Sequence, residues 1–402
     1  MAGIVTLAFA YVLSQFYRTF LAVLTPVLSA ELDATKGDLS AASGAFFLSF
    51  ALAQFAIGVW LDRYGPKRTT AAMLAACGGG GALLFAAAST PWMVTVAMGL
   101  IGFGCAPVLM AAVFIFARIY PPARFAVLTS WMVAFGTAGN VIGASPLANA
   151  AEAFGWRLVM AGLGLITLLA AVAIFALVRD PEKPAEMQAG STGLSGYVEL
   201  LRLKVLWPII PLAAIAYAPS VGIRGLWAGP YLADLYGADT ILIGEVTLFM
   251  ALSMVAGAFV YGPLDQIFKT RKWVAVGGGL VSLLSISWLA LNPVTSLTLA
   301  TIVLVLIGIS GGSYGLIMAH ARAFLPVHLI GRGVTLMNFF TIGGVGLMQF
   351  ATGGVVTASH VPGAPEAAYV MLFAFYAAML ASALLIYLFA RDARPDKGVI
   401  AL

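Results

Sequence analysis

The chain has 402 residues, of which 62% are hydrophobic and 9% are charged, and its mean hydropathy is +1.01. A water-soluble domain carries about 25% charged residues, so this composition excludes a soluble globular protein. It also excludes an intrinsically disordered chain, which combines low hydrophobicity with high charge. The two cysteines lie inside apolar runs and the net charge of +5 is spread along the chain, which argues against a disulfide scaffold and a nucleic-acid-binding patch. The sequence therefore predicts a polytopic membrane protein.

Twelve apolar runs are long enough to cross a bilayer, which requires about 20 residues in a helix. They lie at about 4–30, 38–61, 69–89, 92–119, 125–151, 156–178, 207–235, 240–263, 273–291, 296–325, 331–358 and 366–390. A polar segment at 179–206 separates the sixth run from the seventh. We therefore expect an all-α membrane protein with an N-terminal six-helix bundle (1–178), a cytoplasmic linker (179–206) and a C-terminal six-helix bundle (207–402).

Lysine and arginine residues are distributed unevenly between the two sides of these predicted spans. Of the 21 basic residues, 17 fall on one side, Lys36 and Arg157 fall on the other, and Arg18 and Arg224 lie within spans. The positive-inside rule then places both termini in the cytoplasm. The first apolar run is too long for a cleavable signal peptide and has no basic leader. We expect a multi-pass protein of the bacterial inner membrane.

The two sets of six runs carry matching landmarks. Arg18 and Arg224 are 206 residues apart, and Asp62 and Asp265, in the loops after the second and eighth runs, are 203 apart. Ala117-Arg118 and Ala321-Arg322 end the fourth and tenth runs at an offset of 204. One nearly constant offset indicates a duplicated six-helix unit, and parallel repeats of this kind occur in transporters with a substrate site near the bilayer midplane.

The loop between the second and third runs reads Gly58-Val-Trp-Leu-Asp62-Arg63-Tyr-Gly65-Pro-Lys67-Arg68, and a degraded copy follows the eighth run. This motif resembles the signature loop of the major facilitator superfamily. The resemblance implies a secondary transporter that works by alternating access and is usually monomeric. It also implies that Asp62 and Arg63 join a cytoplasmic charge network that holds the outward-open state. We assign gating to the residues of this loop, Gly58, Asp62, Arg63, Gly65, Lys67 and Arg68; the alternative is that its charges only set the topology.

The two arginines within spans are the main candidates for a binding site. An arginine at the centre of a spanning helix costs about 2.5–3.5 kcal/mol and stays charged, so it is expected to face a wet cavity or a partner. The same polar spacing accompanies both, in Tyr11-x-x-Ser14-x-x-x-Arg18 and Tyr217-x-x-Ser220-x-x-x-Arg224. In a continuous helix this spacing places the three side chains on one face.

An anion is the ligand that these arginines favour. Glu245, about five residues into the eighth run, is the deepest of the 16 acidic residues, so the runs offer little negative charge to balance the arginines. Planar guanidinium groups bind carboxylate or phosphate in a bidentate manner. An arginine on each of the first and seventh spans is similar to organophosphate/phosphate antiporters, which implies an anion-binding role for Arg18 and Arg224. The supporting donors are Tyr11, Tyr217, Ser14 and Ser220, and Gln15, Trp227, Tyr314 and Asn338 are further candidates to line the site.

Several alternatives remain open on the sequence alone. The arginines could instead pair with carboxylates or backbone carbonyls and tie helices together. The protein could instead be a proton-coupled exporter of drugs or neutral solutes, a copper importer that uses Met250-x-x-x-Met254, or a receptor that does not transport. Glu245 is a candidate for proton coupling, so protons or a counter-anion are potential partners besides the anionic substrate and membrane lipid. No catalytic motif, cofactor motif or metal-ligand cluster is found in the sequence, and we expect neither an enzyme nor a nucleic-acid-binding protein.

Overall fold

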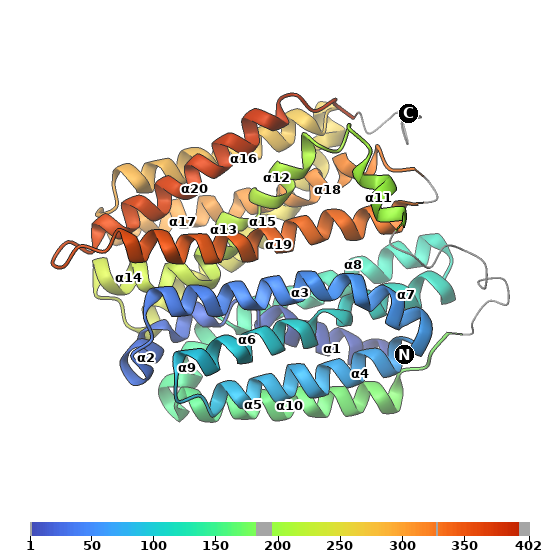
Figure 1. Cartoon of the computed structure of the whole chain (residues 1–402), viewed down its shortest axis with the longest axis horizontal. Coiled ribbons are helices and arrows are strands. Elements are labelled where there is room, and N and C mark those ends of the chain that lie inside the picture. The colour runs from blue at the N-terminus through green and yellow to red at the C-terminus, as the bar shows by residue number, and fades with distance from the viewer. Residues whose placement is uncertain (1, 182–194, 327–328, 394–402) are drawn as a thin grey trace. The chain divides into compact units, whose positions relative to one another are not determined.

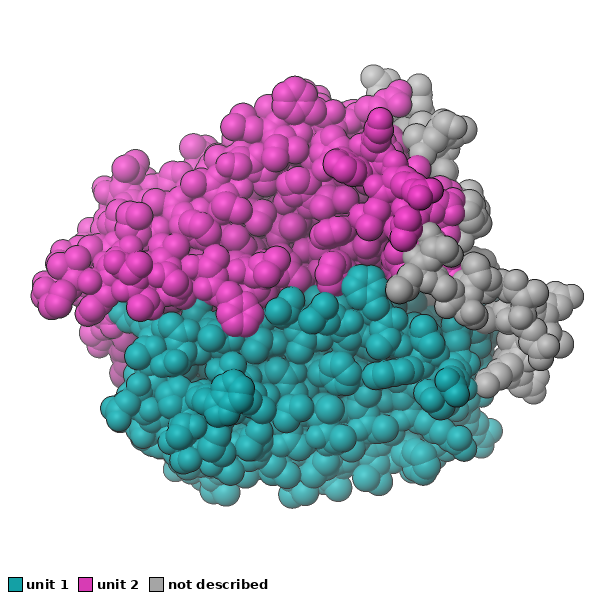
Figure 2. Space-filling view, in the orientation of Figure 1, with its two compact units in different colours: residues 1–192 teal, residues 193–402 magenta. Residues whose placement is uncertain are grey.

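The computed structural model describes residues 2–181, 195–326 and 329–393, and these residues form helices and no strands (Figure 1). The chain divides into two compact units, Met1–Thr192 and Gly193–Leu402, coloured separately in Figure 2. Residues 182–194 of the predicted linker lie outside the described residues, and a short helix, α11 (Ser195–Leu201), forms part of the remainder.

Unit 1 contains eleven helical segments within the described residues, and several of them combine into one bent span. In chain order they are α1 (Ala2–Phe16), α2 (Leu21–Leu32), α3 (Lys36–Tyr64), α4 (Pro66–Met73), the π-helix η1 (Leu74–Gly79), α5 (Gly80–Ala86), α6 (Pro91–Cys105), α7 (Pro107–Ile119), α8 (Pro122–Ile142), α9 (Ser145–Phe154) and α10 (Trp156–Leu177).

Unit 2 repeats this arrangement after α11, with its first span again divided. Its described segments are α12 (Ile209–Ile215), α13 (Ala218–Gly222), the π-helix η2 (Ile223–Trp227), α14 (Ala228–Tyr236), α15 (Thr240–Phe268), α16 (Lys272–Leu291), α17 (Leu297–Gly311), α18 (Tyr314–Arg322), α19 (Ile330–Ala358) and α20 (Glu366–Tyr387).

Ten helical spans among the described residues are long and apolar enough to cross a membrane, and α1 with α2, bent by 51°, makes an eleventh if the pair is one span. The predicted run at 125–151 corresponds to α8 and α9, which a break at Gly143 and Ala144 separates; in it only Trp131–Ile142 is found as a shorter apolar helix. Many large apolar side chains on these helices are exposed, as expected where lipid rather than water surrounds them. An all-helical, multi-pass membrane fold is therefore confirmed, while the count of twelve spans stays a prediction.

Small residues permit the closest helix contacts in each unit. In unit 1, α3 packs along α6, where a Cβ at Gly102 would collide with the carbonyl oxygen of Phe46. In unit 2, α15 packs along α17, where a Cβ at Gly257 would collide with the carbonyl oxygen of Ile309. Since a larger residue would force the backbones apart, these glycines set how tightly the second span of each unit packs on the fourth.

Side-chain caps begin the same two spans in both units. The Thr35 hydroxyl accepts from the Asp38 N–H at the start of α3, and the Asp239 carboxylate accepts from the Leu242 N–H at the start of α15. Thr90 and Ser296 cap α6 and α17 in the same way. Each cap satisfies a backbone donor that the helix itself leaves unpaired, so the repeat extends to the details of helix initiation.

Candidate functional site

Arg18 lies at the break in the first span, not inside a continuous helix. Helix α1 ends at Phe16, and residues 17–20 form a turn before α2. The Arg18 guanidinium carbon lies 4.4 Å from the centre of the Phe50 ring on α3. Its Nε is buried and has no hydrogen-bond partner among the described residues. Arg18 as a whole is half-buried, and a cation–π contact is weaker than a hydrogen bond to a charged acceptor, so the Nε–H remains a donor that these contacts do not use.

The predicted polar stripe of the first span divides among three neighbours. The Tyr11 ring packs against Gly136 of α8 and its hydroxyl accepts a hydrogen bond of 2.7 Å from Gln15 Nε2. The Ser14 hydroxyl points to the Cys105 carbonyl at the end of α6, at 3.5 Å. The expectation of one continuous polar face is therefore not met, because α1 ends before Arg18 and the side chains contact different helices.

Arg224 also lies where the helix is irregular, in the π-helix η2, and only 3% of the residue is exposed. A π-helical turn adds a residue to the helix and is frequent at functional sites. The in-span arginines of both units thus occupy interruptions of the α-helix, where a side chain can be directed independently of the regular 3.6-residue period.

Three of the predicted binding residues of unit 2 come together around Tyr314. The Tyr217 ring stacks on the Tyr314 ring with 4.8 Å between ring centres and 29° between their planes. The Tyr314 hydroxyl donates to Asn338 Oδ1 of α19 at 3.2 Å. All three residues are half-buried, so each retains surface that a ligand can contact. We call Tyr217, Tyr314 and Asn338 the tyrosine cluster.

Ser220 and Trp227 lie deeper in unit 2 and are bonded within its bundle. The Ser220 hydroxyl donates to the Ile307 carbonyl at 2.6 Å. The Trp227 indole N–H donates to Gln349 Oε1 at 3.1 Å and to Thr352 Oγ1 at 3.0 Å. Both residues are fully buried, and these contacts tie the first span of the unit to α17 and α19. Their position indicates a packing role rather than contact with a substrate.

The motif loop of unit 1 contains an ion pair and a backbone contact that hold the turn from α3 to α4. Asp62 pairs with Arg118, at the end of α7, with 3.2 Å between Oδ1 and Nη2. The Asp180 carboxylate, just beyond α10, accepts from the Lys67 N–H at 2.8 Å and lies directly against Gly65, whose φ is +85°. The loop therefore joins the ends of the second, fourth and sixth spans of this unit.

The other motif residues are placed less specifically. The Arg63 guanidinium lies over the Tyr64 ring and the Lys67 ammonium over the Phe175 ring. Arg68 is exposed. A Cβ at Gly58 would meet open space, so in this structure the first glycine of the motif has no steric requirement.

The degraded copy in unit 2 preserves these contacts with different residues. Asp265 pairs with Arg271 at 3.2 Å, and Arg271 also donates to the Ala319 carbonyl of α18. Asp392, after α20, accepts from the Thr270 hydroxyl at 2.7 Å and from the Lys272 N–H at 3.0 Å. Burial alone would raise the pKa of Asp392, but together with the nearby His320 these hydrogen bonds hold it below its ordinary value.

Asp180, Asp392 and Arg118 were missed as site residues in the sequence. A signal was available, because Arg179-Asp180 and Arg391-Asp392 each follow the last span of a half.

Glu245, the proposed coupling residue, is exposed in the second turn of α15. Met250 is fully buried and Met254 half-buried, and no group of three or more His, Cys, Asp or Glu side chains suited to a metal is found in the described part of the chain.

Comparison with known proteins gives the family. The sequence model of the Major Facilitator Superfamily matches residues 7–348. A probable L-galactonate transporter of Escherichia coli (strain K12) is 23% identical over an alignment of 299 positions that covers 68% of this chain. The match spans 61% of that relative's length.

Solved structures share the fold at low sequence identity. A bacterial homologue of the human lysosomal transporter Spinster, inward-facing and occupied, is 20% identical with a TM-score of 0.73, and 96% of each chain is covered. The nucleoside transporter NupG is 13% identical with a TM-score of 0.75, covering 97% of this chain and 100% of that one. A D-xylose-proton symporter is 13% identical with a TM-score of 0.74, covering 96% and 97%. With its family match over most of its length, the chain belongs to the Major Facilitator Superfamily and is a membrane transporter rather than an enzyme.

Proposed function

We propose that this protein is a secondary transporter of a small organic anion, with Arg18 and Arg224 as its anion-binding residues. The single observation that carries the proposal is the state of Arg18, whose cationic group rests on the Phe50 ring while its buried Nε has no hydrogen-bond acceptor among the described residues. An anionic substrate would supply that acceptor. Hydrogen bonds to charged groups contribute about 1.5–3 kcal/mol each, enough to account for substrate affinity in the micromolar to millimolar range when several are formed.

The Escherichia coli relative favours a carboxylate over a phosphate as the substrate. The substrate in its name, L-galactonate, is a polyhydroxylated carboxylate. The tyrosine cluster offers two hydroxyls, an amide and a stacked aromatic surface, a combination suited to the hydroxyls and C–H faces of such a molecule. Tyr11 and Gln15 are proposed as additional contacts from unit 1, whereas Ser14, Ser220 and Trp227 are proposed to act through the packing of the spans that carry the arginines.

The finer points of topology and mechanism are part of the same proposal. We infer twelve spans in two halves, 1–178 and 207–402, with both termini in the cytoplasm of a bacterium and the chain a monomer of its inner membrane. Binding of the anion neutralises the arginines and favours a change of access, and the ion pair of Asp62 with Arg118 stabilises one of the two states because it joins two helix ends. Glu245 is the candidate for coupling to protons; a counter-anion is the other way to drive transport.

A thermal-stability screen of the detergent-purified protein tests the proposal. The probes are L-galactonate, D-gluconate, inorganic phosphate, glycerol 3-phosphate, uncharged galactose and Cu(I), since a ligand that binds the folded protein raises its unfolding temperature. We expect a hydroxylated carboxylate to stabilise the wild type, and Arg18→Gln and Arg224→Gln each to weaken that response by about 10- to 100-fold in ligand concentration.

Arg157→Gln is the matched control. Arg157 donates to the Ala88 carbonyl at 2.6 Å and lies 3.6 Å from Glu31, so its loss should lower stability without changing the ligand response. Stabilisation by galactose or Cu(I) alone, or an anion response that survives both arginine substitutions, would refute the anion proposal and favour the exporter or copper-importer alternatives. A response to phosphates alone would leave the arginine site in place and overturn the carboxylate assignment.

A further inference from the structure

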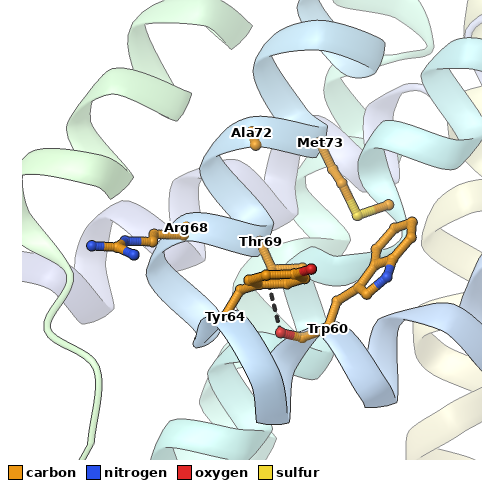
Figure 3. A pocket seen from close by; sticks show the side chains of 6 residues that line it. All are labelled: Trp60, Tyr64, Arg68, Thr69, Ala72 and Met73. Atoms are coloured by element: carbon orange, nitrogen blue, oxygen red, sulfur yellow. Dashed lines mark hydrogen bonds between the residues drawn. The ribbon is translucent and has the colours of Figure 1, made fainter.

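The cleft between the end of α3 and the start of α4 in unit 1 has a volume of about 300 Å³ and is drawn in Figure 3. The Tyr64 hydroxyl is directed toward Trp60 and Met73, and Arg68 extends away on the opposite side of the Tyr64 ring. The Thr69 hydroxyl already donates to the Trp60 carbonyl at 3.1 Å. A binding site needs polar groups that converge, and such groups are found in unit 2, around the π-helix η2.

Gln349 of α19 is the residue on which these groups converge. Its Nε2 donates to the Gly222 carbonyl at 3.2 Å, and its Oε1 accepts from the Trp227 indole N–H at 3.1 Å. An indole N–H can only donate and a carbonyl can only accept, so these two partners determine which end of the amide faces each of them. Gln349 and Trp227 are fully buried, and hydrogen bonds made away from water are strong and hold one arrangement of the chain.

The two partners of Gln349 lie at the two ends of η2. Gly222 directly precedes the π-helix, and Trp227 is its last residue. Arg224 lies between them in the chain and is itself buried. One side chain of α19 therefore bridges the whole irregular segment that carries the arginine.

This bridge favours a π-helical turn over a regular α-helix. In an α-helix, residues five apart point about 140° away from each other around the axis. In η2 the Ala228 N–H donates to the Ile223 carbonyl five residues back, and such bonding brings residues five apart onto nearly the same side. Gly222 and Trp227 are also five residues apart, so the π-helical turn lets one amide contact both. A return to α-helical bonding would break this bridge and redirect Arg224.

Glycine at position 222 leaves room for the bridge. A Cβ there would lie 3.4 Å from Gln349 Nε2 and 2.5 Å from the Tyr376 hydroxyl of α20, so a larger residue would push both side chains away from the backbone. Helix α19 also carries Asn338 of the tyrosine cluster, about three turns before Gln349 and therefore on the same helical face. The face of α19 that contributes to the tyrosine cluster thus also holds η2.

We infer that Gln349 is a positioning residue of the proposed anion site, which it serves by bridging the two ends of η2 and so fixing the direction of Arg224. The inference rests on the anion-binding role proposed for Arg224. Gln349 is buried in the bundle and acts through the turn rather than by contact with the anion. A long side chain that becomes ordered only on binding lowers affinity, so an arginine that is held in place beforehand binds the same anion more tightly.

Gln349→Met, which keeps a side chain of similar size and removes both hydrogen bonds, tests the inference in the full-length protein in detergent. Hydrogen exchange followed by mass spectrometry reports local opening of residues 223–228 and needs no ligand. Because the Trp227 N–H keeps Thr352 Oγ1 as an acceptor at 3.0 Å, the net loss is the bond to Gly222. We expect about 2- to 12-fold faster exchange, the factor equivalent to one hydrogen bond.

The second measurement is the concentration of L-galactonate or inorganic phosphate that gives half of the thermal stabilisation. Gln349→Met should raise this concentration by about 2- to 12-fold, the factor equivalent to ordering one long side chain on binding. In an Arg224→Gln background it should raise the concentration no further, because no guanidinium remains to be positioned. A purely structural loss would instead have the same effect in both backgrounds.

Thr352→Val is the matched control. Thr352 follows Gln349 by one turn of α19, is also fully buried and accepts from the same indole N–H, but its replacement leaves the bond to Gly222 in place. Exchange at residues 223–228 and the ligand concentration should therefore stay at their wild-type values. If Gln349→Met does not fold, Gln349→Asn takes its place, because its amide is one methylene too short to meet both partners, and the same shifts are expected.

Unchanged exchange in the Gln349 variant, equal effects in Thr352→Val, or a further loss of ligand response in the Arg224→Gln background would each overturn the inference. A normal ligand response in Gln349→Met, where Arg224→Gln loses it, would overturn the inference alone and leave the proposed function intact. A wild type that neither probe stabilises, or a response that survives Arg224→Gln, would refute the anion-binding role of Arg224 and the positioning role with it. Faster exchange would in that case leave Gln349 as a structural bridge only.

Discussion

The turn from α3 to α4 depends more on Gly65 than on any other residue of the motif. Its φ of +85° and ψ of 157° lie in a region that only glycine adopts readily, and a Cβ there would lie 2.6 Å from the Asp180 carboxylate. Gly65→Ala therefore introduces backbone strain of about 1–3 kcal/mol. It also displaces the carboxylate from the Lys67 N–H, a loss of about 1 kcal/mol. We expect the free energy of unfolding to fall by about 2–4 kcal/mol in total.

Two other glycines provide matched controls in a thermal unfolding assay followed by tryptophan fluorescence. Gly155 has a similar backbone, with φ of +78° and ψ of 141°, but a Cβ there meets nothing within 4 Å, so Gly155→Ala carries the strain alone. Gly58 lies inside α3, also with open space around a Cβ, and Gly58→Ala should be neutral or gain about 0.5–1 kcal/mol. From the highest unfolding temperature to the lowest, the expected order is Gly58→Ala, wild type, Gly155→Ala and Gly65→Ala.

A double-mutant cycle isolates the contact with Asp180. In an Asp180→Ala background no carboxylate remains to be displaced, so Gly65→Ala should cost about 1 kcal/mol less than in the wild type. If Gly65→Ala is as stable as Gly155→Ala and the cycle shows no coupling, the argument that Asp180 holds this turn is wrong.

Three further outcomes follow from the same contacts. Asp62→Asn and Arg118→Gln should each change stability by less than about 1 kcal/mol, because the pair is partly exposed. Both should nevertheless slow cellular uptake of the anion found in the screen, and exchanging the two residues should restore part of it; uptake equal to wild type in both single variants would contradict a gating role. Lys269 ends α15 with φ of +54°, so Lys269→Gly should raise stability by up to about 1 kcal/mol in thermal unfolding, and a loss would show that its side chain matters more than its backbone. Since the pKa of Asp392 is lowered in the folded state, its contribution is present above the ordinary carboxyl pKa and is lost as the pH falls through the lowered value. Between about pH 5 and about pH 3 the wild type should therefore lose stability more steeply than Asp392→Asn, and parallel profiles would refute the linkage.

Composition and the lengths of the apolar runs were sufficient to predict an all-helical membrane transporter, and the loop at Gly58–Arg68 was sufficient to predict its family. Both conclusions depend on properties that add along the chain, namely hydrophobicity and a contiguous motif. They need no knowledge of which helix contacts which. The absence of an enzymatic motif in the sequence likewise agreed with a transporter.

The breaks within spans were not predicted, although they control the position of both arginines. A count of apolar residues gives the same result whether the run is straight or interrupted, so the first run was treated as one helix from Ile4 past Arg18. In the structure α1 ends at Phe16. The spacing of Tyr11, Ser14 and Arg18 therefore no longer places Arg18 on the same helical face as the other two residues. Pro107, which begins α7 directly after the end of α6, is the kind of local signal that could have indicated such a break.

The long-range hydrogen bonds of Asp180 and Asp392 were not predicted from the sequence either, for a different reason. Both residues follow the last span of a unit, where charged residues are expected on topological grounds alone. Their role depends on the sixth and twelfth predicted spans ending beside the turns at Gly65 and Thr270, a proximity between segments more than 100 residues apart.

Comparison of the two units extends the proposed function to substrate selectivity. The contacts that recur in both, Ser14 and Ser220 to a carbonyl of the fourth span in each unit, join helix to helix and leave no donor for a ligand. The equivalent tyrosines differ, because Tyr11 is only 4% exposed and bonded to Gln15, whereas Tyr217 is half-buried and stacked on Tyr314. The helix-to-helix contacts are thus the same in both units, whereas the surroundings of the two tyrosines differ. We infer that the arginines provide a shared affinity for negative charge, while the tyrosine cluster of unit 2 distinguishes one anion from another.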